Sequence, residues 1–472
     1  MKIKQIYTGC LAQGAYYIES KGEVAIIDPL REVQPYIDKA NKNNAKIKYI
    51  FETHFHADFV SGHVTLAEKT GAPIIYGPTA ETKFKSHIAA DGDVFKLGEI
   101  TLTVLHTPGH TLESVCYLLK DKDGKDYALF SGDTLFLGDV GRPDLAQKFA
   151  NLNKEQLAGI LYESLRTKIM TLADDVIVYP AHGAGSACGK NLSTETVGTI
   201  GEQKRVNYAL RANMTKEEFI QEVTDGLLPP PLYFPLNAKL NREGYENVED
   251  IIRDAIAYDV TTFEMVANKI DTVILDVRHQ DEYAKGHVPR SIFIGIDGDF
   301  APWVGALIPD IKQPILLITP LGREEESILR LARVGYDNTL GYLKGGFDTW
   351  KNEGLEYDTV NSVSAVMLEE IVEEAKEENE KVIIFDVRKD YEYEKEHIEN
   401  VPSTPLDNIN DHLAEFPKEE EFYLHCAGGY RSMIAASILK ARGYHNLINV
   451  AGGYNAIKKT AIKTIYGIHH SL

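Results

Sequence analysis

Cysteine is scarce in this chain of 472 residues. Its four cysteines, Cys10, Cys116, Cys188 and Cys426, stand at irregular spacings that suggest no disulfide framework. Few and unpatterned thiols are typical of a reducing compartment, and the first residues show no charged segment followed by an apolar one, as a secretion signal would have. We therefore expect a cytoplasmic protein.

An excess of positive charge and long apolar runs are also missing. The formal net charge is −20, which opposes binding to nucleic acid or to an anionic membrane. No stretch approaches the ~20 consecutive apolar residues that a transmembrane helix needs. An anionic substrate must therefore be bound by backbone donors or by individual arginines. At about 100–200 residues per domain, the length predicts roughly three domains.

The first half of the chain alternates short β-rich runs with turn residues, at 24–28, 47–54, 100–110, 127–135 and 176–183. Each run ends in a polar or ionisable cluster, and strand ends that deliver such side chains are how α/β scaffolds build sites. Helical stretches follow at about 195–225. The proline-rich segment 227–237 then predicts a linker, because proline is poorly tolerated in helix interiors and central strands.

Beyond this segment the chain repeats itself with an offset of 110, since residues 272–294 match residues 382–406. The repeat pairs Asp276, Arg278, Tyr283 and His287 with Asp386, Arg388, Tyr393 and His397. A repeat of this length predicts two copies of one α/β domain. We therefore place the domains at 1–245, 246–357 and 358–472, and interpret the acidic run 369–381 as a solvated helix face.

Four polar clusters in the first domain carry metal-binding residue types: His54, His56 and Asp58 in HFHAD, His110 in HTPGH, Asp133 in SGDTL, and His182 in YPAHG. A lone histidine after a strand is usually a core or capping group, but together these clusters predict a metal site. His63, His87 and His106 lack such company, and we expect them to be structural.

Residues 1–225 resemble the metallo-β-lactamase superfamily through HxHxD, TPGH, GDTL and PAHG, which implies a four-layer αββα sandwich. In its two-metal members a histidine follows the aspartate of the first motif, whereas Phe59 stands here, and this departure implies a mononuclear centre. Among these relatives the chain is most similar to the persulfide dioxygenases. That resemblance implies one Fe(II) per chain, bound by His54, His110 and Asp133. His56, Asp58 and His182 would lie beside the metal.

Two imidazoles and one carboxylate leave several coordination positions open, as in the non-haem Fe(II) oxygenases. Zinc stays open as a substitute, since ligand identity alone does not exclude it. In the segment 135–145, which resembles the substrate-side loop of these dioxygenases, Arg142 is a candidate for holding an anionic carrier. A structural ion pair with Asp139 or Asp144 is an equal alternative. Cys188 is a candidate pocket residue, with a buried structural thiol as the default.

The second repeat carries HCAGGYRS at residues 425–432, between an apolar strand and an apolar helix, and it resembles the rhodanese fold. Backbone N–H groups of such a loop and of the helix N-terminus form an anion cradle, which favours a nucleophilic Cys426 thiolate able to carry sulfane sulfur. Arg431 would close the ring or hold an oxyanion. The alternative, a phosphatase-like loop, has Cys-x₅-Arg rather than Cys-x₄-Arg.

The first repeat is catalytically blank, because no cysteine occurs between Cys188 and Cys426. Anchoring the repeats on Gly335 and Gly443 places Arg323 opposite Arg431 and Ile318 opposite Cys426. Three glutamates at 324–326 would also repel an anion there.

The whole chain resembles the persulfide dioxygenase–sulfurtransferase fusions of sulfide detoxification. The resemblance implies oxidation of a thiol persulfide by O₂ to sulfite, and transfer of a second sulfur through Cys426 to give thiosulfate. The thiol carrier is left open among coenzyme A, glutathione, bacillithiol and free cysteine, and we expect a homo-oligomer. A glyoxalase-II-like thioester hydrolase with a sulfurtransferase is the alternative enzyme, and a sulfur carrier or sensor the alternative of another class.

Overall fold

The structure, a computed structural model, describes residues 1–147, 151–269 and 271–466. It divides into two compact units. The first is Met1–Asp250 with Pro309–Ile311 and Leu329–Asp337, and the second is Ile251–Ile308 with Lys312–Ile328 and Asn338–Leu472. Within the described residues, no helix has the length and apolar character needed to cross a membrane.

The first unit contains two six-stranded sheets. One sheet has the order β1 (Lys2–Thr8), β2 (Gln13–Ser20), β3 (Glu23–Ile27), β4 (Lys46–Phe51), β5 (Ile74–Tyr76) and β6 (His87–Ile88). The other has the order β12 (Gly198–Thr199), β11 (Ile177–Pro180), β10 (Asp126–Gly132), β9 (Val115–Lys120), β8 (Ile100–His106) and β7 (Val94–Leu97).

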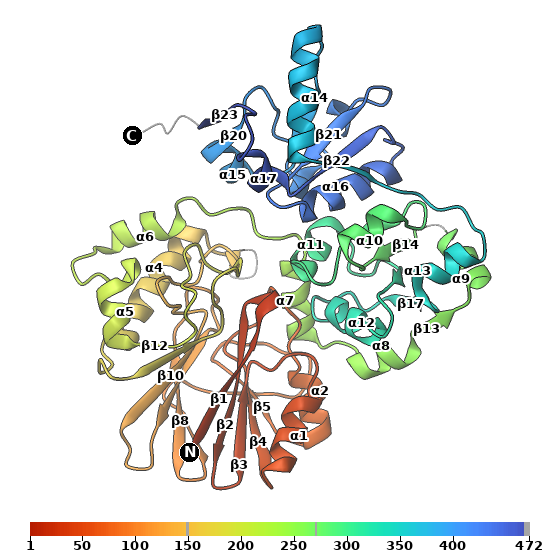
Figure 1. The fold of residues 1–472 in the computed structure, drawn as a ribbon. Coiled ribbons are helices and arrows are strands. Elements are labelled where there is room, and N and C mark those ends of the chain that lie inside the picture. Colours follow the sequence, from red (N-terminus) through yellow and green to blue (C-terminus); the bar gives the residue numbers. More distant parts are fainter. Residues whose placement is uncertain (148–150, 270, 467–472) are drawn as a thin grey trace. The chain divides into compact units, whose positions relative to one another are not determined.

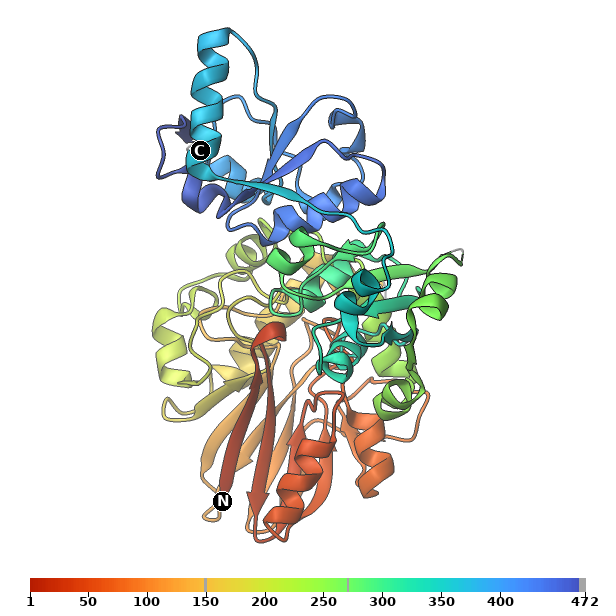
Figure 2. The ribbon, with the colours of Figure 1, turned by 45° about the vertical axis from the view of Figure 1, so that its right-hand side comes forward.

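Helices cover the outer face of each sheet (Figures 1 and 2). The first sheet carries α1 (Gln34–Lys42) and α2 (His63–Thr70), and the second carries α4 (Lys154–Ser164), α5 (Ile200–Val206) and α6 (Lys216–Thr224). Short helical turns lie at η1 (Gly9–Leu11), η2 (Leu165–Ile169) and η3 (Tyr208–Leu210). The αββα sandwich expected from the motifs is therefore present.

Alternation along the strands explains why both sheets are covered on both faces. In β2, Tyr16 and Ile18 pack into the core between the sheets, while Ala15 and Tyr17 pack under α1 and α2. Successive strand residues point to opposite faces. A strand with apolar residues at successive positions therefore buries both of its faces, which places it between two layers of the fold.

The proline-rich segment contains a helix that the sequence did not predict, because α7 begins at Phe234 and runs to Glu243. Pro235 occupies the first turn, where the missing N–H group has no helical partner to lose. Prolines exclude a helix interior, but they are compatible with a helix start. The expectation of a linker through residue 237 was therefore wrong at its C-terminal end.

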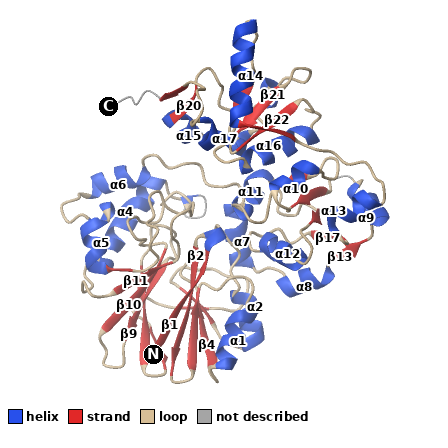
Figure 3. Ribbon diagram, viewed as in Figure 1, coloured by secondary structure: helices blue, strands red, loops and turns tan. Residues whose placement is uncertain are grey.

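The second unit holds two parallel sheets, one per repeat (Figure 3). The first has the order β13 (Ile256–Tyr258), β17 (Thr339–Leu343), β16 (Ile315–Ile318), β14 (Val273–Asp276) and β15 (Ile292–Phe293). The second has the order β18 (Asn361–Ser364), β22 (Leu447–Ala451), β21 (Phe422–His425) and β19 (Ile384–Asp386), with a separate pair β20 (Glu396–Ile398) and β23 (Thr464–Tyr466).

Helices connect these strands. The chain order gives α8 (Val248–Asp254), α9 (Val260–Ala267), α10 (Gln280–Lys285), α11 (Phe300–Leu307), α12 (Glu324–Ala332), α13 (Gly346–Asn352), α14 (Ala365–Glu378), α15 (Asp390–Lys395), α16 (Tyr430–Ala441) and α17 (Gly453–Ile457), with short turns η4 (Leu406–Asn408) and η5 (Leu413–Glu415). The acidic run predicted as a solvated face lies on α14 and is mostly exposed.

The repeated residues make the same contacts in both copies. Arg278 pairs with Asp276 at 2.6 Å, and Arg388 pairs with Asp386 at 2.7 Å. The rings of Tyr283 and His287 stack with centroids 3.9 Å apart, and the corresponding rings in the second copy stack at 3.8 Å. The Asp–Arg pairs lie at the ends of β14 and β19, and the Tyr–His stacks lie at the helices α10 and α15 that follow these strands. These contacts do not involve the catalytic loop.

Candidate metal centre and sulfurtransferase loop

Three strand ends bring His54, His110 and Asp133 together. His54 follows β4, His110 follows β8, and Asp133 follows β10 directly. Asp133 Oδ2 lies 3.7 Å from His54 Nε2 and 3.4 Å from His110 Nε2, and all three side chains are buried. Two atoms each about 2.1 Å from one metal ion would lie about 3.0–3.4 Å apart. This spacing is close to that of a ligand set.

The remaining polar atoms of these residues are already held by the protein. His54 Nδ1 lies 3.0 Å from Thr53 Oγ1, and His110 Nδ1 donates to the carbonyl of Arg142 at 2.8 Å. Asp133 Oδ2 has no hydrogen-bond partner within the described chain. Metal-binding histidines commonly donate their other ring N–H in this way. The three residues therefore fit a metal ion bound through two Nε2 atoms and one carboxylate oxygen.

Electrostatics favour the protonation states that ligation needs. Burial, with a contribution from His56, lowers the pKa of His54 well below its usual value, so this imidazole is neutral. Burial tends to raise the pKa of Asp133, but the opposite effect of His182 and His54 is larger, so the pKa lies well below its usual value. The group is therefore an ionised carboxylate. Neutral imidazole and ionised carboxylate are the forms that bind a metal.

His182 links two carboxylates beside this set. Its Nδ1 lies 2.8 Å from Asp133 Oδ1, and its Nε2 lies 2.8 Å from Asp58 Oδ2. Burial tends to lower the pKa of His182, but the two carboxylates raise it well above its usual value. Asp58 and His182 are therefore placed next to the candidate ligands, as expected, and form an ion pair with each other.

His56 is directed to a different buried group. Its Nε2 lies 3.2 Å from Asp28 Oδ1 and 3.8 Å from Glu52 Oε2. The fully buried ring of Phe59 lies against it, with centroids 4.4 Å apart. An apolar ring thus stands at the position that carries the histidine of a two-metal motif.

Cys188 lies at the edge of the centre, within 4.8 Å of Asp58 and His182 by their ligating atoms. Burial, Asp58 and Asp133 raise the pKa of its thiol well above the usual value. Arg142 is buried and forms two bonds with Asp144, at 2.7 and 2.8 Å, and further bonds with the carbonyls of Ala187 and Leu228. The structure thus shows the ion-pair alternative for Arg142, whose own carbonyl orients His110.

The three histidines expected to be structural lie outside this set. His63 is buried against Tyr76 and Phe84, and burial lowers its pKa to about 3. His106 Nε2 lies 2.9 Å from the carbonyl of Leu112, and His87 is exposed on β6.

The second repeat forms the expected loop between β21 and α16. Cys426 follows β21 and is 1% exposed, and the N–H of Gly429 donates to its Sγ at 3.1 Å. Gly429 has φ +105°, a backbone conformation that glycine adopts without strain. The loop therefore directs a backbone donor at sulfur, at the start of a helix whose positive end favours an anion.

Arg431 is held by Glu392, which the sequence did not single out. Arg431 Nη2 donates to Glu392 Oε1 at 2.9 Å, and Nη1 donates to Oε2. Burial tends to raise the pKa of Glu392, but the hydrogen bonds and charge of Arg431 lower it below its usual value. The signal was present in the repeat, where Glu282 occupies the equivalent position before the tyrosine.

Strand register corrects the alignment of the blank loop. Asp276 is opposite Ile318, and Asp386 is opposite His425. Thr319 is therefore the counterpart of Cys426, and the pairing of Ile318 with Cys426 was wrong. The blank loop is one residue shorter before Arg323, so counting back from the glycine displaced the alignment by one position. The absence of cysteine is unaffected.

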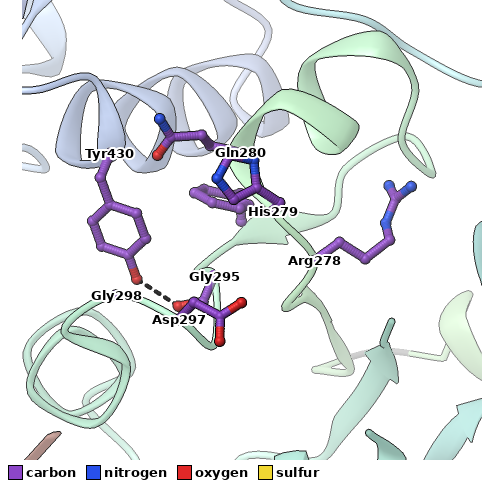
Figure 4. A pocket seen from close by; sticks show the side chains of 8 residues that line it. Arg278, His279, Gln280, Gly295, Asp297, Gly298 and Tyr430 are labelled. Atoms are coloured by element: carbon purple, nitrogen blue, oxygen red, sulfur yellow. Dashed lines mark hydrogen bonds between the residues drawn. The ribbon is translucent and has the colours of Figure 1, made fainter. Parts of the chain in front are cut away.

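A cavity of about 240 Å³ lies between the two repeats, beside the active loop (Figure 4). Its lining includes Gln280, Phe293 and Gly298 of the first repeat, which lacks a cysteine, and Tyr430 of the Cys426 loop. The hydroxyl of Tyr430 donates to the carbonyl of Gly295 at 2.8 Å, as the dashed line in Figure 4 shows. The blank copy therefore contacts the loop that carries Cys426.

Comparison with known proteins agrees with this fold. The metallo-beta-lactamase superfamily profile matches residues 8–182. The cytoplasmic hydroxyacylglutathione hydrolase of Arabidopsis thaliana is 31% identical over 185 residues, which are 38% of this chain and 67% of that protein. The enzyme of the same name from Francisella philomiragia is 33% identical over 184 residues, 39% of this chain and 68% of its own.

A crystal structure of a metallo-beta-lactamase from Staphylococcus aureus subsp. aureus COL is 32% identical, with a TM-score of 0.64, and the match covers 73% of this chain and 99% of that one. The chain belongs to the metallo-β-lactamase superfamily. The rhodanese-like domain profile matches residues 262–353 and 368–460. A metallo-β-lactamase-fold enzyme domain is thus followed by two rhodanese-like domains, and its His/Asp groups indicate a bound metal.

One residue near the metal-binding motif was not suggested by any sequence pattern. Asn241 of α7 is fully buried and bonds to three backbone groups of residues 56–61. It lies outside residues 8–182, the part that matches the metallo-beta-lactamase profile. A single asparagine about 180 positions from its contacts carries no local signature.

Proposed function

We propose that this enzyme is a non-haem Fe(II) persulfide dioxygenase coupled to rhodanese sulfur transfer. The observation that carries the proposal is the metal set itself. Nε2 of His54 and His110 and Oδ2 of Asp133 converge, while Phe59 occupies the second-site position and His56 faces Asp28. One metal with open positions suits an oxygenase better than a two-metal hydrolase.

Bound iron would supply the electrons that activate O₂ beside a substrate sulfur. The protein's own contribution is to hold three ligand atoms on one side and to keep the ligands dry. Overall, a thiol persulfide, O₂ and water give the thiol, sulfite and two protons. His182 between Asp133 and Asp58 fixes the carboxylate orientation, so Oδ2 rather than Oδ1 is presented.

The rhodanese step needs no further oxidant. The Cys426 thiolate attacks the outer sulfur of a second persulfide, the substrate S–S bond breaks, and the thiol leaves with a proton. Sulfite then attacks the outer sulfur on Cys426, and the bond between this sulfur and Cys426 Sγ breaks. Thiosulfate leaves and the Cys426 thiolate is restored. Gly429 N–H stabilises the thiolate in both halves of the cycle.

The proposed co-substrates are a low-molecular-weight thiol persulfide, O₂ and sulfite, in a reducing cytoplasm as part of sulfide detoxification, and the proposed assembly is a homo-oligomer. A thioester hydrolase is the second candidate, because two relatives carry the name hydroxyacylglutathione hydrolase. Phe59 at the second-site position opposes it.

An oxygen electrode with a panel of thiol persulfides tests the proposal on protein loaded anaerobically with iron. We expect O₂ uptake, one iron per chain, and thiosulfate as the main product. Full activity with zinc alone, or hydrolysis of acyl-thiol esters without O₂ uptake, would favour the hydrolase.

Cys426→Ser separates the two steps. The variant should still consume O₂, because the metal ligands are untouched, but should release sulfite in place of thiosulfate. Anion chromatography at early times measures both products before sulfite reacts with leftover persulfide. Unchanged thiosulfate would show that Cys426 is not the transfer residue.

A further inference from the structure

The metal-binding loop, defined here as residues 54–61, is held by side chains and backbone from far along the chain. Asn241 Nδ2 donates to the carbonyls of His56 and Phe59, each at 2.8 Å, and its Oδ1 accepts from the N–H of Ser61 at 2.8 Å. One amide thus satisfies three backbone groups on both sides of Asp58. Its orientation is fixed, since only the NH₂ end can face two carbonyls.

A segment of the blank rhodanese repeat completes this support. Residues Leu329–Asp337 belong to the first compact unit, although they lie within the rhodanese match at 262–353. The N–H of Val60 donates to the carbonyl of Arg333 at 2.7 Å. Val60 lies between Phe59 and Ser61, two of the three loop residues that Asn241 holds. Four backbone groups of the loop therefore bond to residues outside the superfamily match.

This segment is itself anchored by a buried charge. Arg31 is fully buried and forms a two-pronged pair with Asp337, with Nη2 donating to Oδ2 at 2.7 Å. Arg31 also donates to the carbonyls of Ala332 and Glu246. Because the planar guanidinium of Arg31 bonds to all these acceptors, it fixes both the position and the orientation of the 329–337 segment.

Close packing joins the segment to α7. Gly335 has φ +86°, and a Cβ at this position would lie 2.6 Å from Asn237 Oδ1. Any larger residue would therefore push the segment away from the helix that carries Asn241.

A continuous series of contacts connects this support to a metal ligand. Asn241 fixes the backbone on both sides of Asp58, Asp58 forms an ion pair with His182, and His182 hydrogen-bonds to Asp133 Oδ1. The last bond decides which oxygen of Asp133 is free for the metal. A loop shift would turn this carboxylate without removing any ligand.

We infer that α7 and the 329–337 segment of the blank repeat position the metal centre, with Asn241 as the positioning residue. The catalytically blank copy is then a structural part of the dioxygenase site. This inference rests on the metal centre of the proposed function but not on its substrate.

The test measures how fast a ferrous chelator removes iron from the full-length protein. Asn241→Asp keeps the shape but replaces the NH₂ donor by an oxygen that faces two carbonyls, and Asn241→Ala removes the group. We expect iron loss to become roughly ten- to hundredfold faster, as for other residues that hold metal ligands in place. The visible absorption of the cobalt(II)-substituted protein should also change, because the ligand geometry changes.

The chain offers a matched control on the same helix. Asn237 is also a fully buried asparagine, one turn earlier, and its side-chain nitrogen and oxygen have no hydrogen-bond partner within the described chain. Asn237→Asp keeps the shape of the side chain and its packing against Gly335. It should therefore leave the iron loss rate within about twofold of the parent and the cobalt spectrum unchanged.

Gly335→Ala tests the contribution of the blank repeat. Its control is Gly443→Ala, the equivalent position of the active repeat, where φ is +87° and nothing lies within 4 Å of an added Cβ. Both variants carry the same backbone strain, but only Gly335→Ala displaces the segment. We expect faster iron loss from Gly335→Ala alone.

Equal iron retention in Asn241→Asp and Asn237→Asp would overturn the role of Asn241. Equal retention in the two glycine variants would overturn the role of the blank repeat. Neither measurement needs a persulfide, so a failure of the proposed dioxygenase activity would be seen separately, as absent O₂ uptake in the parent. A melting temperature and circular dichroism spectrum close to those of the parent confirm that each variant is folded, because sulfur transfer at Cys426 reports only on the second unit.

Discussion

Gly298→Ala should slow sulfur transfer at Cys426 although it lies in the repeat without a cysteine. A Cβ at Gly298 would lie 2.3 Å from Cζ and 2.5 Å from Cε2 of the Tyr430 ring, which belongs to the active loop. Carbon atoms pack at about 3.5–4.0 Å. The ring must therefore move by about 1 Å or more, and the hydrogen bond from Tyr430 to Gly295 cannot survive in its present form.

The expected magnitude follows from these two losses. A neutral hydrogen bond contributes about 1 kcal/mol, and overpacking a filled contact costs about 1–3 kcal/mol. If these losses raise the activation free energy of sulfur transfer by about 2 kcal/mol, kcat/KM for transfer from thiosulfate to cyanide falls roughly thirtyfold. Tyr430→Phe loses only the hydrogen bond and should fall by roughly fivefold at most.

The assay compares thiocyanate formation and the alkylation rate of Cys426 in the parent and both variants. Mass spectrometry of the Cys426 peptide separates this thiol from Cys10, Cys116 and Cys188. O₂ uptake should be unchanged, because Tyr430 and Gly298 contact no metal ligand among the contacts described. A folded Gly298→Ala variant with parental kcat/KM would refute the reasoning that the blank copy shapes the active loop.

Three further outcomes are expected. Asp133→Ala should lose tightly bound iron and O₂ uptake while thiosulfate:cyanide transfer persists; retention of iron would contradict its role as a ligand. Thr319→Cys in a Cys426→Ser background should form no thiocyanate, since the loop is one residue short and Asp297 and Glu326 already bind Arg323. Because the folded pKa of Glu392 lies below its ordinary 4.5, its pair with Arg431 stabilises the protein above that pH. The melting-temperature difference between parent and Glu392→Gln should thus be present at neutral pH and vanish as pH falls through that depressed value; a difference independent of pH would contradict this.

The fold and the metal residues were predictable because both depend on local patterns. Strands buried on both faces have continuous apolar runs, and polar residues at their ends meet at one edge of the sheets. His54, His110 and Asp133 all follow such runs, which is why the structure brings them together. The repeat predicted two copies of one α/β domain; the Asp–Arg and Tyr–His contacts within each copy came from the structure.

Three features depended on information that the sequence does not hold locally. The start of α7 was missed because proline usually indicates the absence of a helix, although it is compatible with the first turn of one. The Thr319 alignment needed strand register, since a one-residue change of loop length is invisible when counting from a distant glycine. The contacts of Asn241 come from tertiary packing, which no periodicity encodes.

Changes in the loop of the first repeat should have little effect on activity, whereas displacement of its other segments should impair the sites that they contact. The Asp276–Arg278 and Tyr283–His287 contacts that hold the blank repeat do not involve its loop, so the repeat folds without a cysteine. The parts that it offers elsewhere are backbone groups: the carbonyl of Arg333 to the metal-binding loop, and the carbonyl of Gly295 to Tyr430. A backbone carbonyl is retained through any side-chain change that keeps the fold. Mutations confined to residues 319–322 should therefore leave both activities nearly intact, whereas displacing residues 329–337 should weaken the iron site and displacing residues 295–298 should weaken sulfur transfer.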